Sequence, residues 1–330
     1  MTKRDTVLAA LGHEPDGGTP RQLDMTSAFA AKVRDQFGCE NVDTFVGNHL
    51  LRAKYKDNRQ INDTEEVDIF GVTWTQSSDG GDIGTITDHP LKEAALGDYV
   101  FPEIRRDFAS SLCDRLEARQ DVFSMFSITM GFFERAWSLR GMEPVLIDMA
   151  TEPLFAESLF AGIEEHHLAL LDQVLDRDFD CVYFGDDWGQ QQGLIMGPPM
   201  WRKYIKPGLS RIFERIKTSG KTICLHSCGD LRGIFPEIID MGVDVYNTLQ
   251  PEIYDLAEMK REYGKHITFY GGISTQQFLP YATPDEVLSE ARRVRNVLGN
   301  NGGYVLSGTH ALTPDIPVEN MMAMIQAAEE

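Results

Sequence analysis

The sequence predicts an α/β fold, a single (β/α)8 TIM barrel formed by residues 1–330, with an N-terminal excursion of helices and a hairpin. Short apolar segments alternate with longer helical patterns, and eight strand signals can be counted. Strands that alternate with helices predict a parallel sheet, and eight such units predict a closed barrel. The length of 330 residues also fits one barrel of this kind. An open doubly wound sheet stays an alternative, because the pattern alone cannot show closure.

The N-terminal part predicts a helix at residues 3–12, followed by a candidate first strand at residues 20–25. Apolar residues then recur at helical spacing up to Gly38, where a glycine is typical of a helix end. We interpret residues 42–46, V-D-T-F-V, as a candidate short second strand.

An excursion outside the main repeat is predicted within residues 26–121. Residues 67–75 and 84–87 alternate apolar and polar side chains around the turn sequence S-S-D-G-G-D. Two alternating segments around a glycine-rich turn are typical of a β-hairpin.

The pattern becomes regular from residue 121. The sequence T-P-D-E at residues 283–286 is a capping box with proline at the first helical position, which predicts a helix start. We detect no internal repeat, low-complexity segment or interdomain linker. The further predicted strands cover residues 122–130, 181–184, 222–228, 243–247, 267–270 and 304–306, and the further predicted helices cover residues 151–175, 201–216, 232–241, 255–263, 284–298 and 318–325.

Composition excludes several classes of partner. The chain has 31 basic and 51 acidic residues, a formal net charge of -20. Nucleic acids and anionic membranes attract basic surfaces, so neither is an expected partner. The charge also argues weakly against a polyanionic substrate.

Cysteine usage and the N-terminus indicate the compartment. Five scattered cysteines, an odd number, do not resemble a disulfide framework. The N-terminus lacks the apolar core of a signal peptide, and no run of about 18 apolar residues occurs. We therefore expect a cytoplasmic protein outside the membrane, and association into a homodimer stays an open alternative.

The sequence L-H-S-C-G-D presents His226 and Cys228 two residues apart at the end of a predicted strand. Side chains alternate along a strand, so the imidazole and the thiol point to the same face. This pair is a plausible half of a zinc site, since zinc accepts nitrogen and sulfur ligands and a catalytic site leaves one position open. The alternative is a buried cysteine beside a hydrogen-bonded core histidine.

Other chemically active residues fall at the ends of successive predicted strands. In a TIM barrel the active site lies at the carboxyl ends of the strands, so we expect these side chains to surround one pocket. They are Asp24, Met130, Phe132, Glu134, Asp186, Asp187, Asn247, Gln250, Tyr270, Gly271, Gly272 and His310.

His310 is the best candidate for a third zinc ligand. It follows the last strand in the small-residue loop S-G-T-H-A-L-T-P, which can bend over the mouth of the barrel. The alternative is a histidine in a surface loop. His49 is a rival ligand, and whether it or Asp24 joins the site stays open.

Asp186 and Asp187 are candidates for general acid and base, since adjacent carboxylates near a metal shift each other's pKa. A helix-capping aspartate beside a solvated one explains the pair equally well. Glu134 is a further catalytic candidate, although an ion pair with Arg135 or Arg140 is the simpler role for it.

The remaining candidates are expected to bind substrate. Aromatic walls with a few polar groups suit a small aromatic or polar ligand. Residues assigned to substrate binding are Met130, Phe132, Trp188, Asn247, Gln250, Tyr270 and Gly271.

These motifs make the chain similar to the uroporphyrinogen decarboxylase superfamily, and within it to the zinc-dependent methyltransferases that work with corrinoid proteins, such as methylcobalamin:coenzyme M methyltransferase. The resemblance runs from about residue 120 to the end. It is carried by G-F-F-E-R-A-W-S-L-R-G-M-E, G-D-D-W-G-Q-Q-Q-G-L-I-M-G-P, L-H-S-C-G-D, G-V-D-V-Y-N-T-L-Q-P, F-Y-G-G-I-S-T-Q and H-A-L-T-P-D-I-P-V-E-N.

The resemblance implies an eight-stranded barrel that binds zinc through a His-x-Cys pair and a later cysteine. His226 and Cys228 match the pair, whereas His310 stands in place of the later cysteine. One thiolate and two neutral imidazoles leave a zinc site at +1. Coenzyme M is therefore in doubt as the substrate.

We expect a zinc-dependent methyltransferase that moves a methyl group between a small substrate and the cobalt of a separate corrinoid protein. The substrate is a methoxylated aromatic, another methylated compound or a thiol. The chain lacks the D-x-H-x-x-G signature of corrinoid-binding modules, so the corrinoid is expected on a partner. Two alternatives stay open. One is a metal-free decarboxylase, which this chain resembles less well because it lacks the M-R-Q-A-G-R stretch of those enzymes. The other is a non-catalytic ligand-binding barrel.

Overall fold

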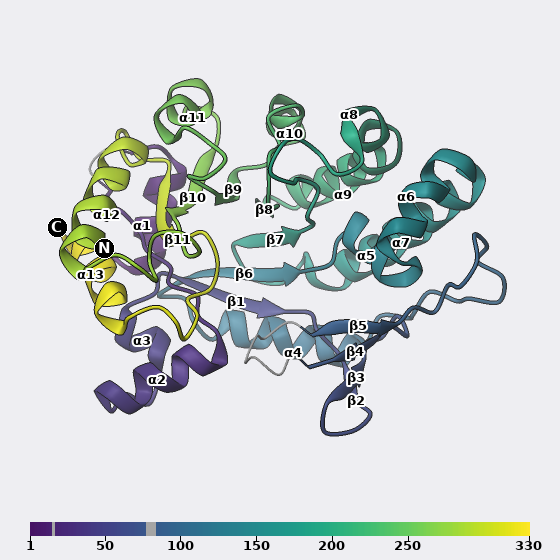
Figure 1. The fold of residues 1–330 in the computed structure, drawn as a ribbon, viewed down its shortest axis with the longest axis horizontal. Helices are drawn as coiled ribbons and strands as arrows, with labels where there is room; N and C mark the ends of the chain where they lie inside the picture. The colour runs from purple at the N-terminus through teal and green to yellow at the C-terminus, as the bar shows by residue number, and fades with distance from the viewer. Residues whose placement is uncertain (15–16, 77–83) are drawn as a thin grey trace.

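The computed structural model describes residues 1–14, 17–76 and 84–330. Its central feature is a curled sheet of seven parallel strands, in which β1 pairs with β6 and each later strand pairs with the next one along the chain (Figure 1). In spatial order the strands are β1 (Leu50–Lys54), β6 (Phe123–Ile128), β7 (Cys181–Gly185), β8 (Thr222–His226), β9 (Val245–Leu249), β10 (Thr268–Ile273) and β11 (Tyr304–Gly308).

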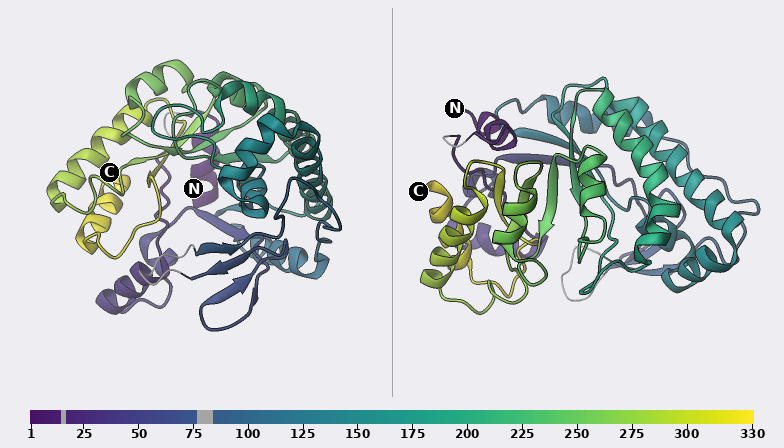
Figure 2. Two further views of the ribbon diagram at one scale, coloured as in Figure 1. Left: turned by 45° about the vertical axis from the view of Figure 1, so that its right-hand side comes forward. Right: turned by 90° about the horizontal axis from the view of Figure 1, so that it is seen from above.

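Helices form an arc around the outside of this sheet, as Figure 2 shows. Within the described ranges, no helix is both long enough and apolar enough to cross a membrane. The helices are α1 (Lys3–Leu11), α2 (Ser27–Phe37), α3 (Val42–Val46), α4 (Arg106–Glu117), α5 (Phe133–Arg140), α6 (Met142–Thr151), α7 (Pro153–Val174), α8 (Gly197–Met200), the π-helix η1 (Trp201–Ile205), α9 (Lys206–Thr218), α10 (Phe235–Asp240), α11 (Leu256–Tyr263), α12 (Pro284–Leu298) and α13 (Val318–Glu329).

The predicted first strand, residues 20–25, is a bridging segment. Arg21 and Met25 each make an isolated parallel bridge, to Leu306 in β11 and to Leu312 beyond it. The Arg21 carbonyl also accepts the backbone N–H of His49, just before β1, at 3.1 Å. The segment therefore contacts both edges of a seven-stranded half-barrel of TIM-like shape.

The predicted second strand at residues 42–46 is wrong, because this segment is the helix α3. The Asn41 side chain caps its first turn by accepting the Thr44 N–H at 2.8 Å. Gly47, at φ 71°, ends it in the left-handed conformation. The Asn41 cap and the left-handed Gly47 thus favour a helix over the predicted strand. The strand in this part of the chain is β1, which the sequence did not predict.

The predicted excursion contains a second, antiparallel sheet of four short strands. The predicted hairpin is confirmed in the pairing of its last two strands, whereas its turn at residues 77–82 lies outside the described residues. This small sheet lies beside the carboxyl end of β1 (Figure 1). Its strands are β2 (Arg59–Gln60), β3 (Glu65–Val67), β4 (Thr73–Thr75) and β5 (Thr85–Asp88).

Alternation along the strands divides the core in two. One set of strand residues faces outward and packs under the helices, as Phe126, Val182 and Leu225 do. The other set forms a smaller cluster on the inner face, which Val7 of α1 joins. The inner cluster consists of Val7, Leu50, Phe123, Met125, Cys181, Tyr183, Cys224, Val245, Tyr270 and Val305.

The half-buried imidazole of His49 makes the fold sensitive to acid. Burial, and then the positive charges of Arg21 and Lys3, lower the pKa of His49 from its ordinary 6.5 to about 4. Between these values the unfolded chain binds a proton that the folded protein excludes. The free energy of unfolding therefore falls as the pH falls from 6.5 to 4.

We predict that His49→Gln makes this dependence shallower by up to about 1.4 kcal/mol per pH unit, because glutamine takes up no proton in either state. Urea unfolding at pH 7, 5.5 and 4.5 measures it. Parallel curves for the variant and the wild type over this range would contradict the assignment.

Candidate active site

A cavity of about 460 Å³ opens at the carboxyl ends of the parallel strands. This volume lies in the usual range of small-molecule sites. The inner face is apolar at the start of the strands and polar at their ends, where Arg52, His226, Asn247 and Ser307 line the cavity. The small sheet supplies the facing wall, with Ile69, Phe70 and Trp74 from β4 and the loop before it.

The three predicted metal ligands all line this cavity and come together around Cys228. Its Sγ lies 3.7 Å from Nε2 of His226 and 3.2 Å from Nε2 of His310. The carboxylate of Asp187 joins them, with Oδ1 at 3.7 Å from Nε2 of His226. The donor atoms of Asp187, His226 and Cys228 all lie within 4.8 Å of one another.

These separations suit one tetrahedral ion. With Zn–N and Zn–S bonds of about 2.05 and 2.3 Å, a nitrogen and a sulfur on one zinc are roughly 3.6 Å apart. The two sulfur–nitrogen distances lie close to this value on either side. Asp187, His226 and Cys228 thus offer a carboxylate, an imidazole and a thiol that fit zinc, whereas His310 approaches the sulfur of Cys228 but is not among the three residues whose donor atoms all lie within 4.8 Å of one another.

Asn247 fixes the orientation of His226. Its Oδ1 lies 2.5 Å from Nδ1 of the imidazole and also accepts the Tyr183 hydroxyl at 3.1 Å. Its Nδ2 donates to the carbonyl of Tyr270. An acceptor at Nδ1 keeps the proton on that nitrogen, so Nε2 presents its lone pair to the cavity.

Close contact between two loops brings Cys228 beside Asp187. Oδ1 of Asp187 accepts the Cys228 N–H at 2.8 Å. A Cβ added at Gly189 would lie 2.5 Å from the Cys228 carbonyl oxygen, so only glycine allows this approach. Gly229 has φ +83°, a conformation that glycine adopts without strain.

The surroundings of Cys228 and His310 favour the neutral form of both side chains. Burial, and then the carboxylate of Asp187, raise the pKa of the Cys228 thiol well above its ordinary value. A thiolate here therefore needs a compensating positive charge. Burial, and then His226, lower the pKa of His310, which favours the neutral imidazole that a metal requires.

Asp186 differs sharply from its neighbour. It is fully buried, and its two oxygens accept the N–H groups of Phe133 at 2.9 Å and Glu134 at 2.8 Å. The indole Nε1 of Trp188 is a third donor. Burial raises the pKa of Asp186 to about 6 despite these donors. The contacts are those of a cap on α5 and favour the capping alternative over general acid or base.

Glu134 faces the cavity near Asp187. Burial, and then the carboxylates of Asp187 and Asp186, raise the pKa of Glu134 well above its ordinary range. Arg135, predicted as its partner, instead pairs with Asp68 at 2.6 Å, and Arg140 pairs with Asp148 at 2.9 Å. Glu134 therefore lacks the ion pair that the sequence suggested.

Several residues assigned to substrate binding lie in the core, not on the cavity wall. Phe132 packs among Phe160, His167 and Phe184, since it follows β6 on the side that the helices cover. Trp188 packs edge-on against Trp201.

The other corrections concern residues near β9 and β10. Gln250 is buried, and its Oε1 accepts the Gly229 N–H at 2.8 Å, which makes it a support for the Cys228 loop. Tyr270 belongs to the inner core cluster, and Gly271 is buried in β10 against Thr248. Met130 and Asn247 do line the cavity, as predicted, and Met130 has a positive φ of 57°.

Of the two residues left open, Asp24 lines the cavity and His49 does not. His49 precedes β1, at the opposite end of that strand from the cavity. Sequence reasoning missed Arg52, Tyr183, His166 and His167, which also line it. The alternation of apolar and basic residues in L-L-R-A-K was the available signal for Arg52.

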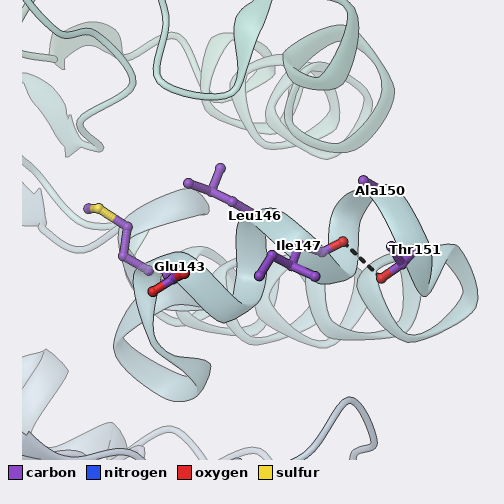
Figure 3. Close-up of a pocket in the computed structure, with 6 residues that line it drawn as sticks. Glu143, Leu146, Ile147, Ala150 and Thr151 are labelled. Carbon is purple, nitrogen blue, oxygen red and sulfur yellow. Dashed lines mark hydrogen bonds between the residues drawn. The ribbon is translucent and has the colours of Figure 1, made fainter.

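A second hollow, of about 660 Å³, is open to the outer face of α6 (Figure 3). Figure 3 shows Leu146 and Ile147 at its wall, and Glu143 as its titratable group. Without a cluster of chemically active side chains, this hollow offers no counterpart to the cavity at the strand ends.

The two adjacent aspartates should respond differently to amidation. We predict that Asp186→Asn lowers the free energy of unfolding by about 1–3 kcal/mol, because an amide NH2 replaces an acceptor of buried N–H groups. Asp187→Asn, the matched control, should cost less, since Asp187 is partly exposed and accepts one backbone N–H. Urea unfolding of both variants measures the difference. Equal stability of the two would remove the capping role from Asp186.

Three sets of known proteins resemble this chain: a sequence family, curated relatives and solved structures. The sequence model of the family "Uroporphyrinogen decarboxylase (URO-D)" matches residues 85–330. The uroporphyrinogen decarboxylase of Coxiella burnetii is 24% identical over 165 residues, which cover 49% of this chain and 44% of that protein. That of Magnetococcus marinus is 20% identical over 217 residues, which cover 61% of this chain and 58% of that protein. The chain thus spans about half the length of the curated relatives it matches.

Among solved structures, a methyltransferase from Methanosarcina mazei is similar over 100% of this chain and 98% of its own, with a TM-score of 0.77 and 16% identity. At this identity the likeness shows a common fold. Since the family model covers well over half of the sequence, the chain belongs to the uroporphyrinogen decarboxylase family.

Proposed function

We propose that this protein is a zinc-dependent methyltransferase that moves a methyl group between a small substrate and the cobalt of a separate corrinoid protein. The observation that carries the proposal is the cluster of His226, Cys228 and His310 at the cavity wall, with sulfur–nitrogen distances of 3.7 and 3.2 Å. The name of the Methanosarcina mazei neighbour, a methyltransferase, is consistent with it.

His226, Cys228 and His310 would hold the zinc, with a fourth position open to the substrate or to Asp187. A zinc ion there would supply a Lewis acid that polarises the substrate sulfur or ether oxygen. Asn247 keeps Nε2 of His226 directed at the site, and Asp187 holds the loop of Cys228 through its N–H.

Glu134 and Asp187 are the groups placed to move a proton. Both line the cavity, and burial favours the protonated carboxyl of Glu134. In ether cleavage, Glu134 would donate that proton to the departing oxygen. In methyl transfer from cobalt to a thiol, Asp187 would accept the proton of the thiol. Asp186 serves this pair indirectly, by fixing the start of the helix that carries Glu134.

The cavity wall indicates the substrate. Phe132 and Trp188, which were expected to surround the substrate, are buried in the core. Phe70 and Trp74 of the excursion line the cavity instead. Aromatic walls with a few polar groups suit a methoxylated aromatic compound or another small methylated one. A thiol that takes a methyl group from cobalt would use the same donors in the reverse direction.

We also propose that residues 20–25 occupy the eighth strand position and close the barrel. Their bonds to β11 and to the residue before β1 support this arrangement. Closure would fix Asp24 on the cavity wall beside Arg52.

A metal-free decarboxylase is the second candidate, and the curated relatives carry that name. A porphyrinogen with many carboxylates would need many free cations, whereas two of the lining cations are already paired, Arg135 with Asp68 and Lys56 with Glu66. A decarboxylase of this kind would keep full activity without zinc.

We predict one zinc per chain in protein purified without added metal, and loss of most of it in Cys228→Ser and His310→Ala, because each removes a donor. Elemental analysis gives the stoichiometry. Cys39→Ser and His266→Ala, outside the cavity, are the matched controls and should keep the metal. Stoichiometric zinc in both site variants would refute the ligand set.

We predict that the protein transfers methyl groups from methoxylated aromatics to a cobalt(I) corrinoid protein. Methylcobalt formation, followed by absorbance, measures this, and Glu134→Gln should slow it by about 100-fold or more, the usual effect of a positioned acid. No methylcobalt with any compound, together with rapid demethylation of methylcobalt by a thiol, would favour the thiol reaction instead.

A further inference from the structure

Arg52 lies inside the cavity with part of its hydrogen-bonding capacity unused. The residue belongs to β1, and its side chain is 17% exposed. Nη2 lies 2.5 Å from Oδ2 of Asp24. In the part of the chain that the structure describes, neither Nε nor Nη1 donates a hydrogen bond to another residue. A guanidinium has five N–H donors, so an edge of Arg52 is available to a ligand.

Asp24 holds this guanidinium in place, and three of its four lone-pair sites are already used. Its Oδ1 accepts from Gln22 at 3.0 Å, and its Oδ2 accepts from Arg52 and from the Tyr270 hydroxyl at 3.3 Å. Burial opposes ionisation, but Arg52 and Gln22 outweigh it and lower the pKa of Asp24. Asp24 is therefore an ionised positioning residue.

Tyr183 connects Arg52 with the metal-ligand cluster. The guanidinium carbon lies 4.7 Å from the centroid of the Tyr183 ring. The His226 ring is stacked against the same tyrosine, with centroids 5.9 Å apart and 26° between the planes. β6 and β7 separate β1 from β8 in the sheet, but Tyr183 of β7 contacts both Arg52 and His226, so one small molecule can reach from the guanidinium to the imidazole.

Two other cations on the cavity wall, Arg135 and Lys56, are already neutralised. Arg135 pairs with Asp68 at 2.6 Å and Lys56 pairs with Glu66 at 2.9 Å. Arg52 pairs with Asp24 through one N–H, which leaves the planar fork that binds carboxylates with two parallel hydrogen bonds. The aromatic wall opposite suits an apolar body, so the cavity fits a small molecule with one carboxylate.

We propose that Arg52 binds a carboxylate of the substrate, so that the compound is a small monocarboxylate whose methyl-bearing atom reaches the cluster of His226, Cys228 and His310. This inference rests on the proposed function for the identity of the reacting group. The carboxylate site itself can be tested without turnover.

Matched acids and amides provide the test. Isothermal titration calorimetry would measure the binding of 2-, 3- and 4-methoxybenzoate and methoxyacetate, each against its carboxamide. We expect at least one acid to bind the wild type about ten-fold or more tightly than its amide, as a charge-assisted Arg–carboxylate pair predicts. If no acid binds more tightly than its amide, the inference is overturned.

Variants then assign the preference to Arg52. Arg52→Gln should lower the affinity of the preferred acid about ten-fold or more and leave the amide within about two-fold. Arg52→Lys keeps the charge without the fork and should lie between, which also covers the case in which Arg52→Gln does not fold. Arg119→Gln, a surface residue paired with Asp121, removes the same charge and should change neither affinity.

An equal loss of affinity for acid and amide in Arg52→Gln would give Arg52 a purely structural role and overturn the inference. Arg52-dependent binding of an acid, without methylcobalt formation from it, would refute the methyltransferase and keep the carboxylate site. Methyl transfer from neutral compounds at a rate unchanged in Arg52→Gln would support the methyltransferase and refute the carboxylate site.

Discussion

The inner face of the curled sheet accepts every second side chain of each strand, and the site depends on how this row changes along the strands. At the start of the strands the inward residues are apolar, as Phe123, Cys181 and Val245 are. At the strand ends they are polar, with Arg52, His226 and Asn247 around one cavity. Because the strands are parallel, their carboxyl ends meet at the same edge of the sheet. The polar residues of the site therefore lie at that edge, and the apolar inner cluster lies at the opposite one.

Loop contact at the ends of β7 and β8 decides which polar atoms meet. Asp187 accepts the Cys228 N–H, and Gly189 lets the two backbones approach. This contact sets Sγ of Cys228 between the two imidazoles. The carboxylate of the preceding residue, Asp186, turns into the core instead, so adjacent residues of the same type have different surroundings.

Charge balance in the cavity is local, whatever the net charge of -20 of the whole chain. Ion pairs neutralise Arg135 and Lys56, whereas Arg52 keeps part of its guanidinium for a ligand. The carboxyl of Glu134 is driven toward its neutral form by burial and by neighbouring carboxylates. The proposed chemistry thus uses one anion-binding group, Arg52, and one proton-holding group, Glu134, on the wall of the same cavity.

Local sequence alone determined the elements whose signals are strong and consistent. The capping box at Thr283, the alternation around His226 and the helical spacing of α7 all lie where the pattern predicted them. Strand alternation predicted that His226 and Cys228 lie side by side, but β8 ends at His226 and the loop contact with Asp187 holds Cys228 in place.

Only the tertiary structure decided which polar residues face the cavity, because that depends on contacts distant in sequence. Trp188 and Phe132 look like pocket aromatics in the sequence but are covered by helices, whereas Phe70 and Trp74 of the excursion fold back over the strand ends. Arg52 was missed because the second strand was assigned to the segment that Asn41 and Gly47 make helical. Burial and partner choice are properties of the assembled sheet, and no local pattern specifies them.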